Sequence, residues 1–229
     1  ALYIPVAFTF VALLAAVLPR RTVMRWVRRA IRLYGAMVLR CNWPFVRVKY
    51  EDLEPAESHA GPFIFVCNHR SASDPFLMAC LPYECVQVVN VWPFRLPFYG
   101  VFAKIAGYLS VHEMPLETFY AKVYELLGDG VCVISFPEGT RSGSREMGAF
   151  TSAIFRAAQQ ADATIVPVAV SGNENIPRKG SLLLRPGRIR VQKLAAVRSE
   201  TYRNMSVFKL KNRVRETLRE HLASIEGAA

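Results

Sequence analysis

Four nearly uninterrupted apolar runs constrain the fold of this chain more than any other feature of its sequence. They are rich in β-branched residues and read PFIFVC (62–67), CVQVV (85–89), VCVISF (131–136) and TIVPVAV (164–170). Runs of this length and composition predict strands that are covered on both faces. Two further segments alternate apolar and basic residues, as edge or half-exposed strands do: FVRVKY (45–50) and RIRVQKL (188–194).

Segments with helical periodicity separate these runs. We expect helices over residues 75–81, 97–106, 116–128, 148–160 and 204–225. The alternation predicts an α/β fold with a central mixed sheet flanked by helices. A chain of 229 residues suits one globular domain, which we place at residues 43–229, after an N-terminal segment of residues 1–42. In such sheets the catalytic and ligand-binding residues usually lie in the loops that follow the strand ends.

Positive charge is concentrated at the start of the chain. The net charge is +11, and residues 1–50 hold nine Lys and Arg residues but no Asp or Glu. Residues 2–18 are uncharged, and as a helix they would extend over roughly 26 Å, a little less than the ~30 Å hydrocarbon core of a bilayer. We therefore expect this apolar stretch to span a membrane or to lie in its interface. The Pro-Arg-Arg that follows does not resemble a signal-peptide cleavage site.

A basic amphipathic helix is predicted after this stretch. On a helical projection, one third of the circumference holds Arg21, Arg25, Arg28, Arg29 and Arg32, and the opposite side holds Val23, Val27, Ala30, Ile31, Tyr34, Met37 and Val38. Such a helix is typical of one lying on an anionic membrane surface. The alternative is a helix that packs on its own domain with its arginines in water. By the positive-inside tendency, the arginines and the domain after them are cytoplasmic.

The cysteines do not indicate a metal site, and the overall charge does not indicate a nucleic-acid-binding site. The five cysteines form no C-x-x-C pair and have no metal-ligand spacing, so we interpret them as reduced thiols in a cytosolic compartment: Cys41, Cys67, Cys80, Cys85 and Cys132. Basic charge can also indicate nucleic-acid binding. Here the charge lies beside an apolar stretch and no nucleic-acid module is visible, so we expect no nucleic-acid partner.

The polar turn NHRSASD (68–74) directly follows the apolar run at 62–67. A neutral imidazole such as that of His69 is the usual general base at neutral pH, and it works better when a carboxylate fixes its tautomer. If His69 ends a strand and Asp74 starts the next helix, the turn brings the two side chains together. Asp74 before Pro75 is also a good helix N-cap. The residues alone leave the catalytic pair and the structural cap as equal alternatives.

A second polar loop, PEGTRSGS (137–144), follows the run at 131–136. Pro137 and Gly139 predict a tight turn. Glu138, Thr140 and Arg141 place a carboxylate and hydrogen-bond donors at the end of a strand. Arg141 together with exposed backbone N–H groups could hold a phosphate or another anion. The alternative is an ordinary surface loop, although a turn alone requires fewer polar groups.

Three of these segments resemble signature blocks of the glycerolipid acyltransferases. In order along the chain they are NHRSASD (68–74), FPEGTRS (136–142) and IVPVAVSG (165–172). The first matches the pattern N-H-x4-D of that family and the second its F-P-E-G-T-R. The resemblance covers roughly residues 20–225 and is closest to the bacterial 1-acylglycerol-3-phosphate acyltransferases. It implies a membrane-associated O-acyltransferase of phospholipid synthesis at the cytoplasmic face of an inner membrane.

The resemblance also implies roles for the quoted residues. His69 would deprotonate the hydroxyl of a lyso-glycerolipid and Asp74 would orient His69. The hydroxyl would then attack an acyl thioester of acyl carrier protein or coenzyme A directly, without an acyl-enzyme. No metal or bound cofactor is implied.

The same resemblance assigns binding roles around the second loop. Glu138, Gly139, Thr140 and Arg141 would bind the head of the acceptor lipid. Pro167 would belong to the block that binds the acyl donor or shapes the core.

One block of the family is altered in this sequence. The family shows Gly, apolar residues and then Asp or Asn followed by Arg, and that Arg is interpreted as a phosphate ligand. The equivalent here is GYLSVHE (107–113), in which Glu113 stands where the arginine is expected, beside His112. Lys104 or Arg95, shortly upstream, could replace the missing charge.

Two alternatives to lysophosphatidate acylation remain open from the sequence. A carboxylate at Glu113 would suit an amine-bearing acceptor such as a lyso-ornithine lipid, and another lysophospholipid is equally an option. A non-catalytic membrane-binding scaffold would explain residues 1–42 but leaves His69, Asp74 and Glu138 without a role.

Overall fold

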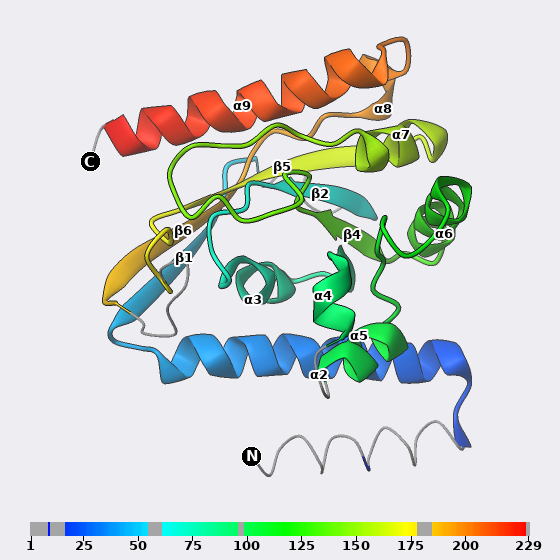
Figure 1. Cartoon of the computed structure of the whole chain (residues 1–229), viewed down its shortest axis with the longest axis horizontal. Helices are drawn as coiled ribbons and strands as arrows, with labels where there is room; N and C mark the ends of the chain where they lie inside the picture. Colours follow the sequence, from blue (N-terminus) through cyan, green and yellow to red (C-terminus); the bar gives the residue numbers. More distant parts are fainter. Residues whose placement is uncertain (1–8, 10–16, 55–60, 96–98, 178–184, 228–229) are drawn as a thin grey trace.

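A central six-stranded sheet organises the chain (Figure 1). The structure is a computed structural model that describes residue 9 and residues 17–54, 61–95, 99–177 and 185–227; nearly all of the apolar stretch 2–18 lies outside these ranges. The strand order is β1-β6-β5-β2-β4-β3. The strands are β1 (Val46–Asp52), β2 (Phe63–Cys67), β3 (Cys85–Val88), β4 (Cys132–Ser135), β5 (Thr164–Ser171) and β6 (Gly187–Lys193).

The sheet is mixed, as the sequence predicts. Strands β5, β2, β4 and β3 are parallel neighbours, β6 is antiparallel to β5, and β1 is parallel to β6. All five residues of β2 are buried, which explains why this strand has no polar alternation. The alternating segment 45–50 forms β1 at one edge of the sheet, which confirms that it is an edge strand.

The helices follow most of the predicted segments. They are α2 (Arg20–Cys41), α3 (Asp74–Ala79), α4 (Val91–Phe94), α5 (Tyr99–Ala106), α6 (Leu116–Gly128), α7 (Ala153–Gln160), α8 (Ser199–Tyr202) and α9 (Val207–Gly227). Sequence periodicity misses α4 and α8, because four residues make barely one helical turn.

Helix α7 is shorter than the predicted helix over residues 148–160. It begins at Ala153 because the residues before it hydrogen-bond to the preceding loop instead of forming a helical turn. The N–H of Gly148 donates to Glu138 Oε2 at 2.7 Å, and the N–H of Thr151 donates to the carbonyl of Pro137 at 2.8 Å.

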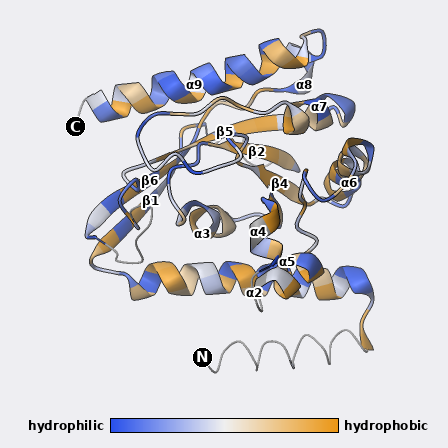
Figure 2. Cartoon of the chain, viewed as in Figure 1, coloured by the Kyte–Doolittle hydropathy of each residue, from blue (hydrophilic) through white to orange (hydrophobic). Residues whose placement is uncertain are grey.

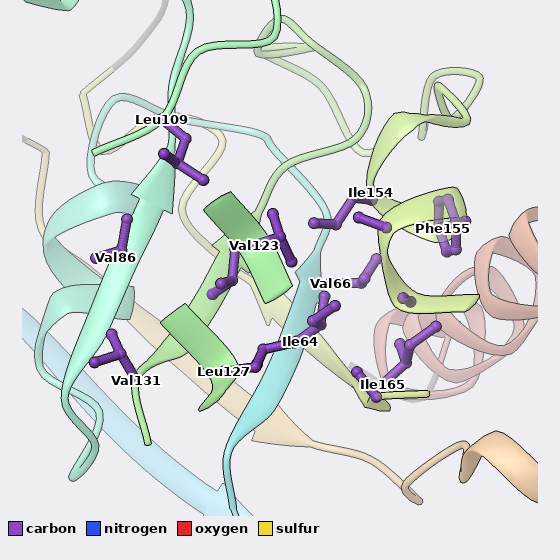
Figure 3. Close-up of a cluster of buried hydrophobic side chains, with 14 of the residues drawn as sticks. Ile64, Val66, Val86, Leu109, Val123, Leu127, Val131, Ile154, Phe155 and Ile165 are labelled. Atoms are coloured by element: carbon purple, nitrogen blue, oxygen red, sulfur yellow. The ribbon is translucent and has the colours of Figure 1, made fainter. Parts of the chain in front are cut away.

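Each face of the sheet has its own apolar core. On one face, side chains of β2 and β5 meet apolar residues that recur at every fourth position of α6 (Phe119, Val123, Leu127) and α9 (Leu210, Val214, Leu218, Leu222). Figure 3 shows part of this cluster, with Ile64 and Val66 between α6 and α7. On the other face, Leu77, Met78 and Leu81 lie against Phe65 and Cys67. Figure 2 shows that hydrophobic residues dominate β2 and β5, whereas α9 carries many hydrophilic residues.

Helix α2 packs on α3 and α5, below the sheet in the view of Figure 1. Val23 and Val27 are buried in the same apolar core as the inward-facing residues of α6 and α9. Three of the five arginines predicted to share one face are paired with carboxylates of the globular part. A guanidinium nitrogen of Arg21 lies 3.0 Å from a carboxylate oxygen of Asp129. The carboxylate of Glu84 pairs with two arginines, at 3.4 Å from a nitrogen of Arg25 and 2.8 Å from a nitrogen of Arg28.

The prediction that all five arginines face a membrane is therefore wrong for Arg28. This residue is 9% exposed, and its Nε donates to the carbonyl of Ala106 at 2.8 Å. Among the five arginines, Arg28 lies on the side of the helix that faces the domain, and there it pairs with the carboxylate of Glu84. Within the described ranges, no helix is both long and apolar enough to cross a membrane.

The buried Arg28 leads to a stability prediction. Arg28→Met removes two hydrogen bonds from the contact between α2 and the domain, so we expect the free energy of unfolding to fall by about 2 kcal/mol. Arg29→Met, on the exposed side of the same helix, is the control and should change it by less than about 0.5 kcal/mol. Denaturant titration of the detergent-solubilised protein measures both values. Equal effects of the two substitutions would contradict this account of how α2 docks.

Candidate active site

The two polar loops meet at one end of the strands, where the carboxyl ends of β2 and β4 lie side by side. Strands β2 and β4 are parallel neighbours, so the loops that follow them leave the sheet at the same end. Backbone hydrogen bonds join the loops directly. The N–H of Ser142 donates to the carbonyl of His69 at 2.8 Å, and the N–H of Gly143 donates to that of Arg70 at 3.1 Å.

His69 and Asp74 are in direct contact, with 2.7 Å between His69 Nδ1 and Asp74 Oδ2. Asp74 is fully buried, whereas the side chain of His69 remains 18% exposed. Because a carboxylate only accepts hydrogen bonds, Nδ1 carries the proton of the neutral ring. The other ring nitrogen, Nε2, is then the basic one, and it has no hydrogen-bond partner among the described residues.

The carboxylate of Asp74 holds the turn rather than capping the helix. Its Oδ2 accepts the backbone N–H groups of Arg70 at 2.8 Å and Ser71 at 2.9 Å, both before α3 begins. The first turn of α3 is closed instead by the carbonyl of Ser73, which accepts the N–H groups of Phe76 and Leu77 at 3.0 Å. Between the two alternatives for Asp74, the geometry therefore selects the pairing with His69.

A cavity of about 530 Å³ opens beside His69. Its volume lies in the range of small-molecule binding sites. Much of its wall is apolar and comes from β3, α6, α7, the loops after β2, β3 and β4, and the segment between α5 and α6. These apolar residues include Val88, Val89, Val111, Phe119, Phe136 and Ile154. The ring of Phe136 lies against the imidazole of His69, with 4.7 Å between the ring centroids. An apolar chain and a reacting group beside His69 can therefore share one space.

The polar part of the cavity wall comes mainly from the predicted second loop. Gly139, Thr140 and Arg141 all line the cavity. Gly139 adopts φ +71°, a left-handed conformation that glycine reaches without strain. Asn90 and His112 also line it, and Asn90 was not among the predicted residues. Asn90 follows a strand end, like the two predicted loops, but a single asparagine there is no distinctive signal.

Lys104 and Glu113 do not line the cavity. Lys104 projects from α5 on the side opposite the buried Ala103 and Ala106, and it is exposed. Glu113 is also exposed, whereas His112 before it faces the cavity. The structure thus separates these two predicted ligands from His69, and any role of theirs toward a head group stays a prediction.

Glu138 braces the two loops instead of lining the cavity. Its Oε1 accepts the N–H of His69 at 2.7 Å, and its Oε2 accepts that of Gly148 at 2.7 Å. Burial raises the pKa of Glu138 above its usual value, although both N–H donors act in the opposite direction. Its carboxylate therefore fixes the backbone position from which the imidazole projects. This contact explains a glutamate in the loop without a contact to substrate.

Several residues that tie the catalytic turn to the rest of the fold were not predicted. The side chain of Asn68 exchanges two hydrogen bonds of 2.8 Å with the backbone of Val170 on β5. Arg70 is buried and pairs with Glu174 at 2.9 Å and with Glu226 at the end of α9. Their partners lie about a hundred residues or more away in sequence, so no local pattern marks them.

No cluster of three or more His, Cys, Asp or Glu side chains suited to a metal ion occurs within the described ranges. At this end of the strands an oriented imidazole and an arginine therefore line one apolar cavity.

Comparison with known proteins gives matches over the same region. A family model described as Acyltransferase matches residues 47–184. The chain is 29% identical over 153 residues to the chloroplastic 1-acyl-sn-glycerol-3-phosphate acyltransferase LPAT1 of Arabidopsis thaliana, covering 65% of this chain and 43% of that protein. It is also 29% identical over 162 residues to 1-acyl-sn-glycerol-3-phosphate acyltransferase alpha of Bos taurus, covering 69% of this chain and 56% of that protein. The matched region thus spans less than two thirds of each relative.

A solved structure shares the fold. The 1-acyl-sn-glycerophosphate (LPA) acyltransferase PlsC of Thermotoga maritima superimposes with a TM-score of 0.78 at 21% identity, covering 98% of this chain and 90% of that one. The residues matched by the family model include nearly all of β1, the whole of β2, β3, β4 and β5, and both polar loops. Since this match extends over more than half of the sequence, the chain belongs to the acyltransferase family.

Proposed function

We propose that this chain is a membrane-associated O-acyltransferase. It moves a fatty acyl group from a thioester to the free hydroxyl of a lyso-glycerolipid, with 1-acylglycerol-3-phosphate as the acceptor and phosphatidate as the product. One observation carries the proposal: His69 borders an apolar cavity while a buried carboxylate holds its Nδ1.

The geometry supports a direct transfer. As the acceptor hydroxyl attacks the thioester carbonyl carbon, its proton passes to Nε2 of His69. Asp74 stabilises the imidazolium that results and does not itself take the proton. The tetrahedral intermediate then expels the thiolate, which takes up the proton from Nε2. Because a thioester is already activated, a positioned base and the orientation of the two substrates supply most of what the reaction needs.

The polar wall of the cavity supports a phosphate-bearing acceptor. Arg141 lines the cavity beside Thr140, and a guanidinium binds phosphate well. No Asp or Glu is among the described residues that line the cavity. An amine-bearing acceptor would need such a carboxylate, and Glu113, which suggested it, lies outside. We therefore favour lysophosphatidate over a lyso-ornithine lipid.

The outward side of α2 supports contact with a membrane. Trp26, Leu33 and Met37 are exposed there next to Arg29 and Arg32, and Leu33 is 69% exposed. Apolar and basic side chains together favour the interface of an anionic bilayer. Together with the apolar stretch 2–18, this side forms our proposed attachment to the cytoplasmic face of an inner membrane. The thioester would come from acyl carrier protein or coenzyme A, and no further cofactor is proposed.

Removing the proposed base tests the chemistry. We expect His69→Ala to lower the rate of acyl transfer from a thioester to lysophosphatidate by about 10²- to 10⁴-fold, because the hydroxyl loses its proton acceptor. His221→Ala on α9, at a residue that does not line the cavity, is the control and should keep its activity. Circular dichroism checks that both variants fold. Full activity of a folded His69→Ala protein would refute the proposed role.

The acceptor head group is tested at Arg141. We expect Arg141→Gln to raise KM for lysophosphatidate about 10- to 100-fold, because a charge-assisted hydrogen bond to phosphate is lost. KM for an uncharged monoacylglycerol should change little. Lys104→Gln is the control, since Lys104 lies outside the cavity. If Lys104→Gln instead raised KM, the assignment of the phosphate to Arg141 would fail. If a lyso-ornithine lipid were the better acceptor of the unaltered protein, the assignment of the head group would fail.

The proposed attachment is tested on the surface of α2. We expect Leu33→Glu to weaken binding to vesicles containing anionic phospholipid by about tenfold, because it puts a negative charge in the interface. Phe208→Glu on α9 is a matched control, since Phe208 is 66% exposed and Leu33 is 69% exposed. Co-sedimentation with vesicles measures both. Equal binding of the two variants would show that this side of α2 does not face the membrane.

A further inference from the structure

We propose that Asn173 is a positioning residue that extends the His69–Asp74 pair to a chain of three side chains. The proposal deepens the function proposed above and rests on it. Asn173 follows β5, in the segment SGNENIP (171–177), and lies directly after IVPVAVSG (165–172), the last segment of the family resemblance. It is 0% exposed, and its amide faces the side of Asp74 that His69 does not occupy.

The contacts divide the carboxylate of Asp74 into two halves. Oδ2 accepts the ring N–H of His69 and the two backbone N–H groups of the turn. Oδ1 accepts a hydrogen bond from Asn173 Nδ2, which also lies 3.2 Å from Ser73 Oγ. Without Asn173, Oδ1 would be a buried anionic oxygen with no donor described beside it. Such an oxygen is costly, and the carboxylate would rotate to find another partner. Rotation would break its alignment with the imidazole.

An amide suits this position because it donates without adding charge. Its orientation is determined by chemistry, since a flipped amide would set two oxygens against each other. A lysine or arginine here would neutralise Asp74 and weaken its support of the imidazolium. An aspartate would place two carboxylates in contact, and one of them would then retain a proton. The side-chain oxygen of Asn173, Oδ1, has no hydrogen-bond partner among the described residues, and it points away from Asp74 because Nδ2 faces the carboxylate.

The backbone that carries Asn173 is held in place by its neighbours. Gly172 turns the chain out of β5 with φ +81°, and a Cβ there would lie 2.1 Å from the carbonyl of Arg188. Glu174 then pairs with Arg70 at 2.9 Å. The hydroxyl of Ser71 donates to the carbonyl of Ile176 at 2.8 Å. Because these contacts hold the segment independently of the amide, a substitution at Asn173 should alter Asp74 without releasing the segment.

The first test removes the amide. We expect Asn173→Leu, which is similar in size, to lower kcat about 10- to 100-fold while KM for lysophosphatidate changes less than about threefold, because orientation is lost and binding is not. Asn175→Leu is the matched control: Asn175 is two residues away, exposed, and should keep normal kinetics. A kcat that falls equally in both variants, or a KM effect alone, would overturn the proposal.

A second test observes His69 without relying on activity. We expect the proton NMR signal of His69 Nδ1–H, which the hydrogen bond to Asp74 shifts downfield, to move upfield in Asn173→Leu, because a rotated Asp74 accepts a weaker hydrogen bond from the ring. The ring signals of His221 serve as internal reference. A His69 signal that stays in place or moves further downfield would show that Asn173 does not position the pair. If instead the unaltered protein failed to acylate any lyso-lipid, the proposed function would fail while this spectrum still decided the role of Asn173.

A third variant covers the case in which Asn173→Leu does not fold. Asn173→Asp keeps the shape of the side chain, and its carboxyl can donate to Asp74 Oδ1 only while it is protonated. We therefore expect the ratio of its kcat to that of the unaltered protein to fall as pH rises and the shared proton is lost. A ratio that is constant across the pH range, or that rises with pH, would contradict the proposal.

Discussion

A buried carboxylate, that of Asp74, is the interaction on which the geometry of the site depends. An ionised carboxylate away from water is costly unless donors surround it. Here the donors come from His69, Arg70, Ser71 and Asn173, which are the imidazole, two backbone groups of one turn and an amide from another segment. The same bonds that satisfy the charge also bend the turn and orient the ring. Stability of the turn and alignment of the proposed base therefore have one cause.

The strand order explains why these groups meet at all. Strand β2 lies between β5 and β4 and is parallel to both. The segments that follow these three strands therefore leave the sheet at the same end, beyond the carboxyl ends of the strands. The turn after β2 is held from one side by Glu138, after β4, and from the other by Asn173, after β5. An apolar cavity opens between these loops and the helices α6 and α7. The apolar cavity therefore lies directly beside the oriented imidazole, as the proposed reaction requires.

Helix α2 divides its charge between two tasks. Arg28 is buried against Glu84 and attaches the helix to the domain, whereas Arg29 and Arg32 are exposed beside apolar side chains. A helix attached in this way presents its outer side in a defined direction relative to the cavity. This arrangement supports the proposed contact of the domain with a bilayer surface, and it shows that part of the basic charge of the N-terminal segment serves to attach α2 to the domain.

The sequence by itself determined the class of fold and the position of the proposed base. Four apolar runs rich in β-branched residues predict β2, β3, β4 and β5, because burial on both faces leaves no room for polar residues. Two segments that alternate apolar and basic residues predict β1 and β6. His69, Asp74 and Arg141 were predicted because each lies in a dense polar loop directly after such a run. The tertiary structure alone showed that Asp74 faces His69 rather than capping α3, that Lys104 and Glu113 lie outside the cavity, and that Arg28 is buried. It alone brought Asn173 to Asp74. The physical reason is that a local pattern records which residues avoid water, whereas the partner of a polar atom depends on which segments the sheet places side by side.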